Sequence, residues 1–155
     1  MKAKRFFLLL TVLSGFLIGC TKTNGDVAKS KSEMLINKKW QLVSLTSQSG
    51  TGVTVINGVD SFPSYRRDDY LLFKSDSTYE YNDNLEPRPG LSSKIIDAGD
   101  WQLARNNTAL EMHSTIWTRT YPLFDIMELT DTKLKMQTKS ESDGSLVVIT
   151  FSRME

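Results

Sequence analysis

Residues 70–81 read YLLFKSDSTYEY, and this stretch decides the fold. Apolar and aromatic residues fill both of its ends, and the polar residues 74–77 separate them. Two short runs of this composition around a polar turn predict a β-hairpin. Because side chains alternate between the two faces of a strand, Phe73, Tyr79 and Tyr81 should share one face. The hairpin therefore indicates an antiparallel sheet with an aromatic inner face.

The same alternation continues on both sides of the hairpin. Turn residues such as Asp143-Gly144 separate the segments, and no helical pattern of ten or more residues lies between them. Consecutive strands joined by short turns are antiparallel neighbours. With the hairpin, the chain has about eight short strands. The six further strand candidates are residues 40–45, 100–103, 109–113, 121–129, 133–137 and 146–151.

A meander of about eight strands either exposes two sheet edges or closes on itself, and closure removes the edges. We therefore predict an all-β fold, an eight-stranded antiparallel up-and-down barrel. A two-layer sandwich is the alternative that the strand pattern leaves open. The residues expected to face the interior are Trp40, Leu42, Phe73, Tyr79, Tyr81, Trp101, Leu103, Leu110, Met112, Phe124, Ile126, Leu134, Met136, Ile149 and Phe151.

Two long polar connections, residues 47–69 and 82–94, interrupt the strands. Connections of this length are often functional. We expect a short strand at residues 53–56 inside the first of them. One helical turn is expected at residues 34–36, before the first strand.

The N-terminal segment has the pattern of a secretory signal. Lys2, Lys4 and Arg5 precede an apolar run over residues 6–19. The run is shorter than the roughly 20 residues that a membrane-spanning helix needs. We therefore expect this segment to be a cleaved signal.

The sequence Leu17-Ile18-Gly19-Cys20 resembles the lipobox of bacterial lipoproteins, in which two aliphatic residues and a small residue precede Cys. The resemblance implies that Cys20 becomes an acylated N-terminus, and two or three acyl chains would anchor the protein firmly. Cys20 is the only Cys, so the chain can form no internal disulfide. An ordinary cleaved signal with an accidental Cys is the alternative.

These observations predict a signal peptide at residues 1–19, a lipidated Cys with a flexible tether at residues 20–33, and a barrel domain at residues 34–155. Removal of the signal takes away three positive charges and leaves a net charge of about −2. No large basic cluster remains, so nucleic acid is not an expected partner.

The residues that follow Cys20 favour one side of the membrane. Some bacterial lipoproteins are sent to the cell surface by acidic residues directly after the Cys. Residues 21–24 read TKTN and contain none. We therefore expect a cell-envelope protein, lipid-anchored to the outer membrane on its periplasmic face.

Four motifs together resemble the lipocalin-like lipoproteins of Bacteroidetes-type bacteria, and the similarity spans most of residues 35–153. The family patterns are Leu-x-Gly-x-Trp-x-Leu, Phe-x-x-Asp-Gly-Thr, Gly-x-Trp-x-Leu and Ile-x-x-Leu-Thr-x-Thr-x-Leu. In this chain Lys replaces the Gly of the first pattern, and Ser77 replaces the Gly of the second. The matching segments are residues 35–42 (LINKKWQL), 73–79 (FKSDSTY), 99–103 (GDWQL) and 126–134 (IMELTDTKL).

These motifs are structural, so the resemblance implies a fold more than a function. In lipocalins a cation from the last strand covers the Trp of the first strand at the closed end of the barrel. The resemblance therefore implies that Arg153 covers Trp40. A solvated C-terminal Arg is the alternative.

The sequence offers little for catalysis. A metal site needs three or four ligands, and the chain has one His, His113, and one Cys that is expected to be lipidated. No nucleophile motif accompanies His113. Asp97 with Asp100, or residues 82–84, could offer oxygens to calcium, but neither has the ligand count of a known loop. We expect no enzyme, no cofactor and no metal.

The barrel interior remains as the candidate site. Eight strands enclose either a filled core or room for one small ligand, and the sequence leaves both open. Tyr79 and Tyr81 would add polar groups to an apolar lining. We expect binding of a small, partly apolar ligand; the alternative is a filled barrel whose loops contact an envelope protein or glycan. The candidate ligand-binding residues are Phe73, Tyr79, Tyr81, Trp101, Met112, Phe124 and Met136.

Overall fold

The computed structural model describes residues 28–48 and 59–155. The expected signal peptide, Cys20 and the strand expected at residues 53–56 lie outside the described residues. The described chain is all-β apart from one short helix and one 3-10 turn. Its elements are α1 (Lys31–Leu35), β1 (Lys39–Gln48), η1 (Ser64–Arg66), β2 (Tyr70–Phe73), β3 (Thr78–Asn82), β4 (Ile95–Ala104), β5 (Ala109–Ser114), β6 (Arg119–Thr120), β7 (Phe124–Leu129), β8 (Lys133–Lys139) and β9 (Leu146–Arg153).

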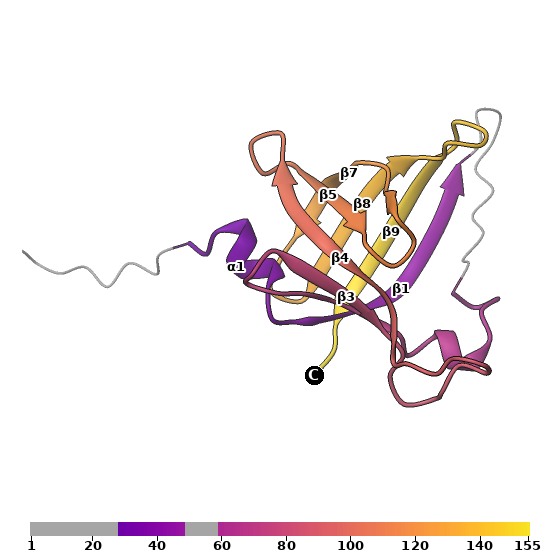
Figure 1. Ribbon diagram of the computed structural model, residues 1–155. Coiled ribbons are helices and arrows are strands. Elements are labelled where there is room, and N and C mark those ends of the chain that lie inside the picture. Colours follow the sequence, from indigo (N-terminus) through magenta and orange to yellow (C-terminus); the bar gives the residue numbers. More distant parts are fainter. Residues whose placement is uncertain (1–27, 49–58) are drawn as a thin grey trace, which may run out of the picture.

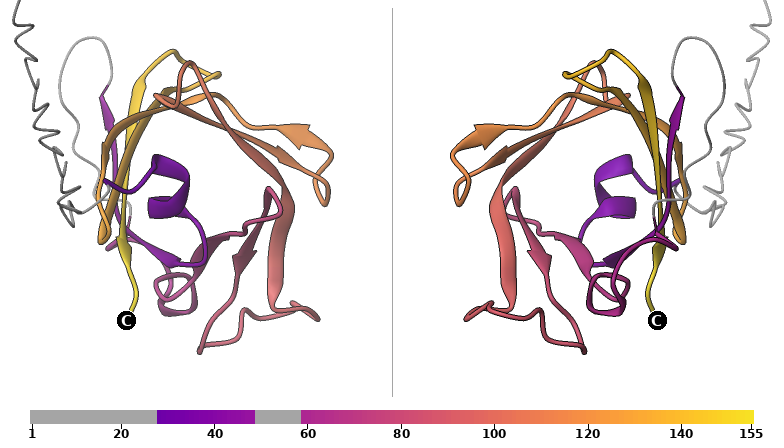
Figure 2. Two further views of the ribbon diagram at one scale, coloured as in Figure 1. Left: turned by 90° about the vertical axis from the view of Figure 1, so that its left-hand side faces the viewer. Right: turned by 90° about the vertical axis from the view of Figure 1, so that its right-hand side faces the viewer.

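The strands form one closed antiparallel sheet (Figure 1). Each strand pairs with its neighbours in the order β4, β3, β2, β1, β9, β8, β7, β5, and a further pairing between β4 and β5 closes the ring. Figure 2 shows this ring end-on. The predicted up-and-down barrel is confirmed, and the two-layer sandwich is excluded because the first strand pairs with the last.

The short strand β6 and the strand β7 are two parts of one broken barrel strand. Both pair with β5: Thr120 lies opposite His113, and Phe124 lies opposite Leu110. Pro122 lies between the two parts and has no N–H to donate to the ladder. The described barrel therefore has eight strand positions, as the sequence predicts, because β6 and β7 share one position.

Bulges change which side chains point inward. The ladder between β1 and β9 skips Val43, which is 43% exposed. An extra residue in one strand shifts the alternation of all residues beyond it. Leu42 and Leu45, three positions apart, consequently both face the interior.

The core is aromatic and lies toward one end of the barrel. Trp40 and Phe73 are fully buried, and the rings of Phe73 and Trp101 meet edge to face with centroids 5.2 Å apart. Every residue expected to face the interior belongs to this core or packs against it. The core also takes in Leu35, Ile36, Leu71, Tyr121 and Leu129, which the sequence analysis did not place there.

Helix α1 covers this end of the barrel, which we call the closed end (Figures 1 and 2). Ser30 and Glu33 form a capping box, in which the Ser30 hydroxyl accepts from the Glu33 N–H and the Glu33 carboxylate accepts from the Ser30 N–H. The helix begins at Lys31, three residues before the expected start of the domain. Within the described residues, no helix is long and apolar enough to cross a membrane.

The expected cover of Trp40 by Arg153 is wrong. Arg153 lies directly opposite Trp40 in the ladder, but its side chain is exposed. The cation near the indole is Lys38, whose Nζ lies 6.0 Å from the ring centroid. The Lys38 ammonium donates to the Met34 carbonyl and to the Asp131 carboxylate, and these two bonds hold it there. Asp131 also accepts from Lys29, so it ties the start of α1 to the turn between β7 and β8.

Strand boundaries differ from the expectation by three residues or more in β7, β4 and β1, and by one or two residues elsewhere. β7 begins at Phe124 and not at residue 121, because Pro122 interrupts the ladder. β4 begins at Ile95, five residues before the predicted strand, because Ile95 and Asp97 already pair with β3 across a bulge. β1 continues to Gln48, where it pairs with Leu146. Both strands therefore reach farther toward the end of the barrel opposite α1.

Candidate functional site

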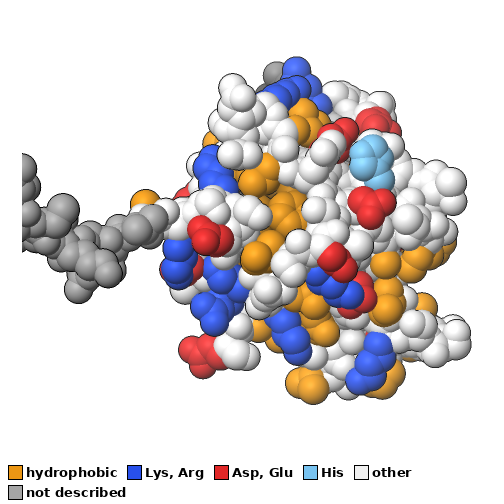
Figure 3. Space-filling view, turned by 60° about the vertical axis from the view of Figure 1, so that its left-hand side comes forward, with side chains coloured by type: hydrophobic (Ala, Val, Ile, Leu, Met, Phe, Trp, Pro, Cys, Tyr) orange, Lys and Arg blue, Asp and Glu red, His pale blue; other side chains and the backbone are white. Residues whose placement is uncertain are grey.

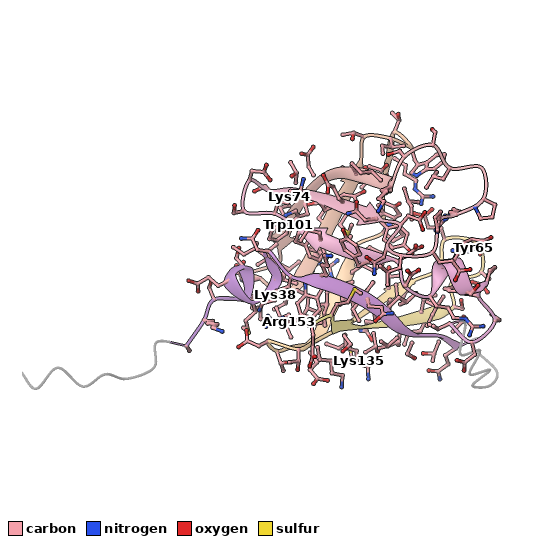
Figure 4. The ribbon with its side chains drawn as sticks, turned by 90° about the horizontal axis from the view of Figure 1, so that it is seen from below. Lys38, Tyr65, Lys74, Trp101, Lys135 and Arg153 are labelled. Carbon is pink, nitrogen blue, oxygen red and sulfur yellow. The ribbon has the colours of Figure 1, made fainter. Side chains whose placement is uncertain are left out.

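The barrel encloses a cavity of about 370 Å³ between the aromatic core and the end opposite α1. We call that opposite end the mouth; η1 lies there, and Figure 4 shows Tyr65 of η1 far from Lys38 and Arg153. Arg66 is exposed and also lines the cavity, so the cavity reaches the surface at the mouth. The lining residues are Leu42, Leu45, Phe62, Arg66, Leu71, Tyr79, Tyr81, Asp97, Met112, Tyr121, Phe124, Met136, Ile149 and Phe151.

Five of the seven candidate ligand-binding residues line this cavity: Tyr79, Tyr81, Met112, Phe124 and Met136. The other two, Phe73 and Trp101, do not. They pack against each other nearer the closed end, and Figure 4 shows Trp101 beside Lys74, whose carbonyl accepts from the indole N–H at 3.2 Å. The structure thus separates the predicted set into a lining group and a core pair.

A buried carboxylate, Asp97, organises the polar part of the lining. Asp97 is only 4% exposed. One oxygen, Oδ2, accepts from the hydroxyls of Tyr79 at 2.9 Å and Tyr121 at 2.6 Å. The other, Oδ1, accepts from the Ser114 hydroxyl at 2.5 Å and from the Ala98 N–H at 2.9 Å. Four donors therefore converge on one acid, from β3, from β5, from β4 itself and from the break between β6 and β7.

A second buried acid lies behind Tyr81. Asp69 is 1% exposed, and its Oδ2 accepts from the Tyr81 hydroxyl at 3.0 Å and from Arg88 at 2.6 Å. Burial raises the pKa of Asp69, and the hydrogen bond from Tyr81 and the charge of Arg88 act against that rise. The backbone N–H of Arg88 also donates to the Asp83 carboxylate, and this bond fixes the loop between β3 and β4 at the mouth.

The three cavity tyrosines remain protonated. The pKa values of Tyr79, Tyr81 and Tyr121 are all raised, first by burial and then by the carboxylates that their hydroxyls contact. A phenol beside a carboxylate resists losing its proton, because ionisation would place two negative charges together. These side chains therefore act as neutral hydrogen-bonding groups.

Six lining residues were not among those expected to face the interior: Leu45, Phe62, Arg66, Leu71, Asp97 and Tyr121. Leu71 could have been found, because it stands two residues before the inward-facing Phe73. Asp97 was available, because it stands two and four residues before Gly99 and the inward-facing Trp101. Tyr121 and Leu45 point inward only because a break or a bulge shifts the alternation. No simple period-two pattern reports such a shift.

The residues weighed for metal or acid–base chemistry do not assemble. Asp97 and Asp100 lie on opposite faces of β4, since Asp97 is buried and Asp100 is exposed. His113 lies near the surface, where its Nδ1 lies 2.9 Å from the Thr120 hydroxyl. Within residues 28–48 and 59–155, no group of three or more His, Cys, Asp or Glu residues is placed to hold a metal ion.

Several loops expose apolar side chains. Leu85 and Leu91 lie in the loop between β3 and β4, and Ile116 and Trp117 lie in the turn between β5 and β6. Figure 3 shows exposed hydrophobic side chains in separate patches among charged ones. Single exposed apolar residues are common on protein surfaces, and contiguous ones can form part of a contact surface.

The closed barrel with an interior cavity defines a lipocalin-like architecture. The chain belongs to the family described as "Domain of unknown function (DUF5004)", whose model matches residues 18–127. Among solved structures it is similar to a bovine odorant binding protein in complex with a selenium-containing odorant, with 13% identity, a TM-score of 0.40, and coverage of 84% of this chain and 76% of that one. No curated protein matches the sequence.

Proposed function

We propose that the chain is a lipid-anchored envelope protein whose barrel binds one small, partly apolar ligand. The observation that carries this proposal is the cavity of about 370 Å³ with an apolar lining and a few fixed polar groups. Ligand pockets of known proteins span about 300–1,000 Å³ and have this kind of lining. The interior leaves more space than a filled core would.

The size of the cavity sets the expected affinity. A ligand that buries about eight methylene groups gains roughly 6 kcal/mol, since each contributes about 0.8 kcal/mol. Loss of the ligand's freedom of motion offsets part of that gain, while a polar group that finds a partner adds to it. We therefore expect dissociation constants between about 1 μM and 1 mM.

Anchoring is supported by the sequence alone. The lipobox-like residues 17–20 follow a basic and apolar signal pattern. With an acylated Cys20, the barrel would be held near the outer membrane, and the sequence after Cys20 favours the periplasmic face. Growth with radiolabelled palmitate tests this: label should enter the wild-type chain, and Cys20→Ser should abolish it. Equal labelling of both would refute lipidation at Cys20.

The ligand site is tested by filling the cavity. The lipidated chain is placed in lipid nanodiscs, because the acyl chains proposed on Cys20 require lipid. It is titrated with the fluorescent apolar probe N-phenyl-1-naphthylamine against empty nanodiscs. Leu45→Trp puts a larger side chain into the lining and should weaken binding about tenfold or more. Val43→Trp, which adds the same side chain at the neighbouring exposed bulge, is the matched control and should change it less than twofold. Equal effects of both would place the site elsewhere.

The exposed apolar loop residues favour a second function, contact with an envelope protein or glycan. Leu85 and Trp117 are the most exposed of them. If Leu85→Ser and Trp117→Ser prevented cross-linking to an envelope component while probe binding stayed unchanged, this second function would be supported.

A further inference from the structure

The direction of the hydrogen bonds around the cavity limits what its polar wall can offer to a ligand. Three tyrosines of the described chain line the cavity, Tyr79, Tyr81 and Tyr121, and each carries one phenol hydroxyl. A phenol has one proton to donate, and its oxygen can also accept. Where each proton goes therefore decides which role is left for a ligand.

All three protons are already committed. Tyr79 and Tyr121 donate to Asp97, and Tyr81 donates to Asp69. Both acids are buried, and an ionised carboxylate can only accept. The phenols cannot turn their protons toward a ligand without leaving a buried carboxylate with one partner fewer, which is costly.

Asp97 itself has no remaining capacity. A carboxylate has about four lone-pair positions, and Tyr79, Tyr121, Ser114 and the Ala98 N–H supply four donors. A ligand therefore meets the phenol oxygens and not the carboxylate. The Arg119 guanidinium lies 4.3 Å from the ring centroid of Tyr121 and interacts with its hydroxyl. Tyr79 is only 1% exposed, and its hydroxyl also interacts with that of Ser114. The partly buried Tyr81 therefore offers the most accessible acceptor.

Among the described residues of the lining, the one cationic donor lies elsewhere. Arg66 lies at the mouth, where its guanidinium stacks 4.5 Å from the ring centroid of Phe62. An anionic headgroup could pair with it only by staying at the surface. Inside the barrel, the fixed polar groups of the lining are acceptors.

We propose that the cavity selects small apolar molecules whose polar group donates a hydrogen bond, such as alcohols and amines, over ketones and carboxylates of the same skeleton. This inference rests on the proposed function and names its ligand class. A ketone would set its oxygen against the phenol oxygens with no proton between them, and a site built for one hydrogen-bonding role discriminates strongly against the other.

The test uses two molecules of the same carbon skeleton, 2-octanol, whose hydroxyl can donate, and 2-octanone, whose carbonyl can only accept, with octanoate as the anionic third. Each is titrated calorimetrically into the full chain in nanodiscs, and empty nanodiscs supply the blank for partitioning. We expect 2-octanol to bind about tenfold more tightly than 2-octanone or octanoate.

Asp97→Asn tests the cause. The Ala98 N–H points at Oδ1, so the amide carbonyl must keep that place and the Asn NH₂ must face Tyr79 and Tyr121. Both phenols then accept from the amide and turn their protons into the cavity. The preference should fall to about twofold or reverse in favour of 2-octanone. Ser114→Ala is the control, because it removes a donor from Oδ1 and leaves both phenols in place, and it should keep the tenfold preference.

The outcomes are distinct. Equal binding of the three molecules, or tighter binding of octanoate, overturns the inference while leaving a ligand site intact; the second result would place the headgroup at Arg66. If neither these molecules nor N-phenyl-1-naphthylamine binds, the proposed function fails as well. Should Asp97→Asn not fold, the ratio measured on the wild-type chain decides alone.

Discussion

Replacement of Trp40 by Phe should loosen the closed end of the barrel. Trp40 is fully buried, and its indole N–H donates to the Leu35 carbonyl at 2.9 Å. Leu35 is the last residue of α1, so this bond joins the helix to the first strand. Phe keeps the aromatic ring but removes the donor and part of the volume.

The expected cost follows from these two losses. Leaving the buried Leu35 carbonyl without its partner costs about 1–3 kcal/mol. The space that the smaller ring leaves adds about 1 kcal/mol, since a full Trp→Ala deletion costs about 3–5 kcal/mol. The free energy of unfolding of Trp40→Phe should therefore fall by about 2–4 kcal/mol.

A double-mutant cycle asks whether the loss acts through α1. Ser30→Ala removes the helix cap and should cost about 1 kcal/mol in the wild-type chain. If Trp40→Phe already releases the helix, the cap no longer matters, and the two losses will not add. Urea unfolding followed by far-UV circular dichroism gives all four free energies. This signal does not depend on the fluorescence of Trp40, which the substitution removes.

Two results would refute this reasoning. A loss below about 0.5 kcal/mol for Trp40→Phe would show that the indole bond contributes little. Full additivity of the two substitutions would show that α1 stays in place without it.

Three further predictions concern single positions. Gly99→Ala should prevent stable folding or raise exposure to proteolysis sharply, because a Cβ at Gly99 would overlap the His113 carbonyl of the adjacent strand; limited proteolysis measures it, and a stable Ala variant would contradict the close approach. Ser77→Gly should raise the free energy of unfolding by about 0.5–1 kcal/mol in urea, because Ser77 has φ 66° and Gly adopts that conformation without strain; a loss of stability would contradict it. Lys29 and Lys38 lower the pKa of Asp131 to about 2. The stability that Asp131 contributes is therefore fully present above its usual pKa near 4 and is lost as pH falls toward 2. The urea midpoint of Asp131→Asn should change less than that of the wild type across this range, and parallel midpoints would refute the linkage.

The sequence was a good guide to the barrel because long parts of its strands alternate at period two. Trp101 and Leu103 on β4, and Leu134 and Met136 on β8, stand at period-two spacing and all reach the core. Ser77 was also informative, since it holds the left-handed conformation at the place where the family pattern has Gly. Such signals are local, and local rules were sufficient to read them.

Part of the cavity lining could not be read in the same way. Tyr121 enters the interior because Pro122 breaks its strand, and Leu45 enters because Val43 bulges out. The position of Lys38, and not Arg153, beside Trp40 depends on Asp131, far along the chain. These features depend on contacts between distant residues, which a single sequence does not display.

The uneven length of the strand pairings bears on how fast a ligand would enter and leave the barrel. β1 and β9 are joined over their whole length, whereas β5 and β7 share only the pairs at Ala109 and Leu110 before Pro122 interrupts them. Local opening of the sheet should begin at this short pairing of β5 with β7, beside Tyr121 and Phe124. We expect the residence time of an occupant to follow the opening of that side of the wall, even where its affinity is set by the acceptors inside.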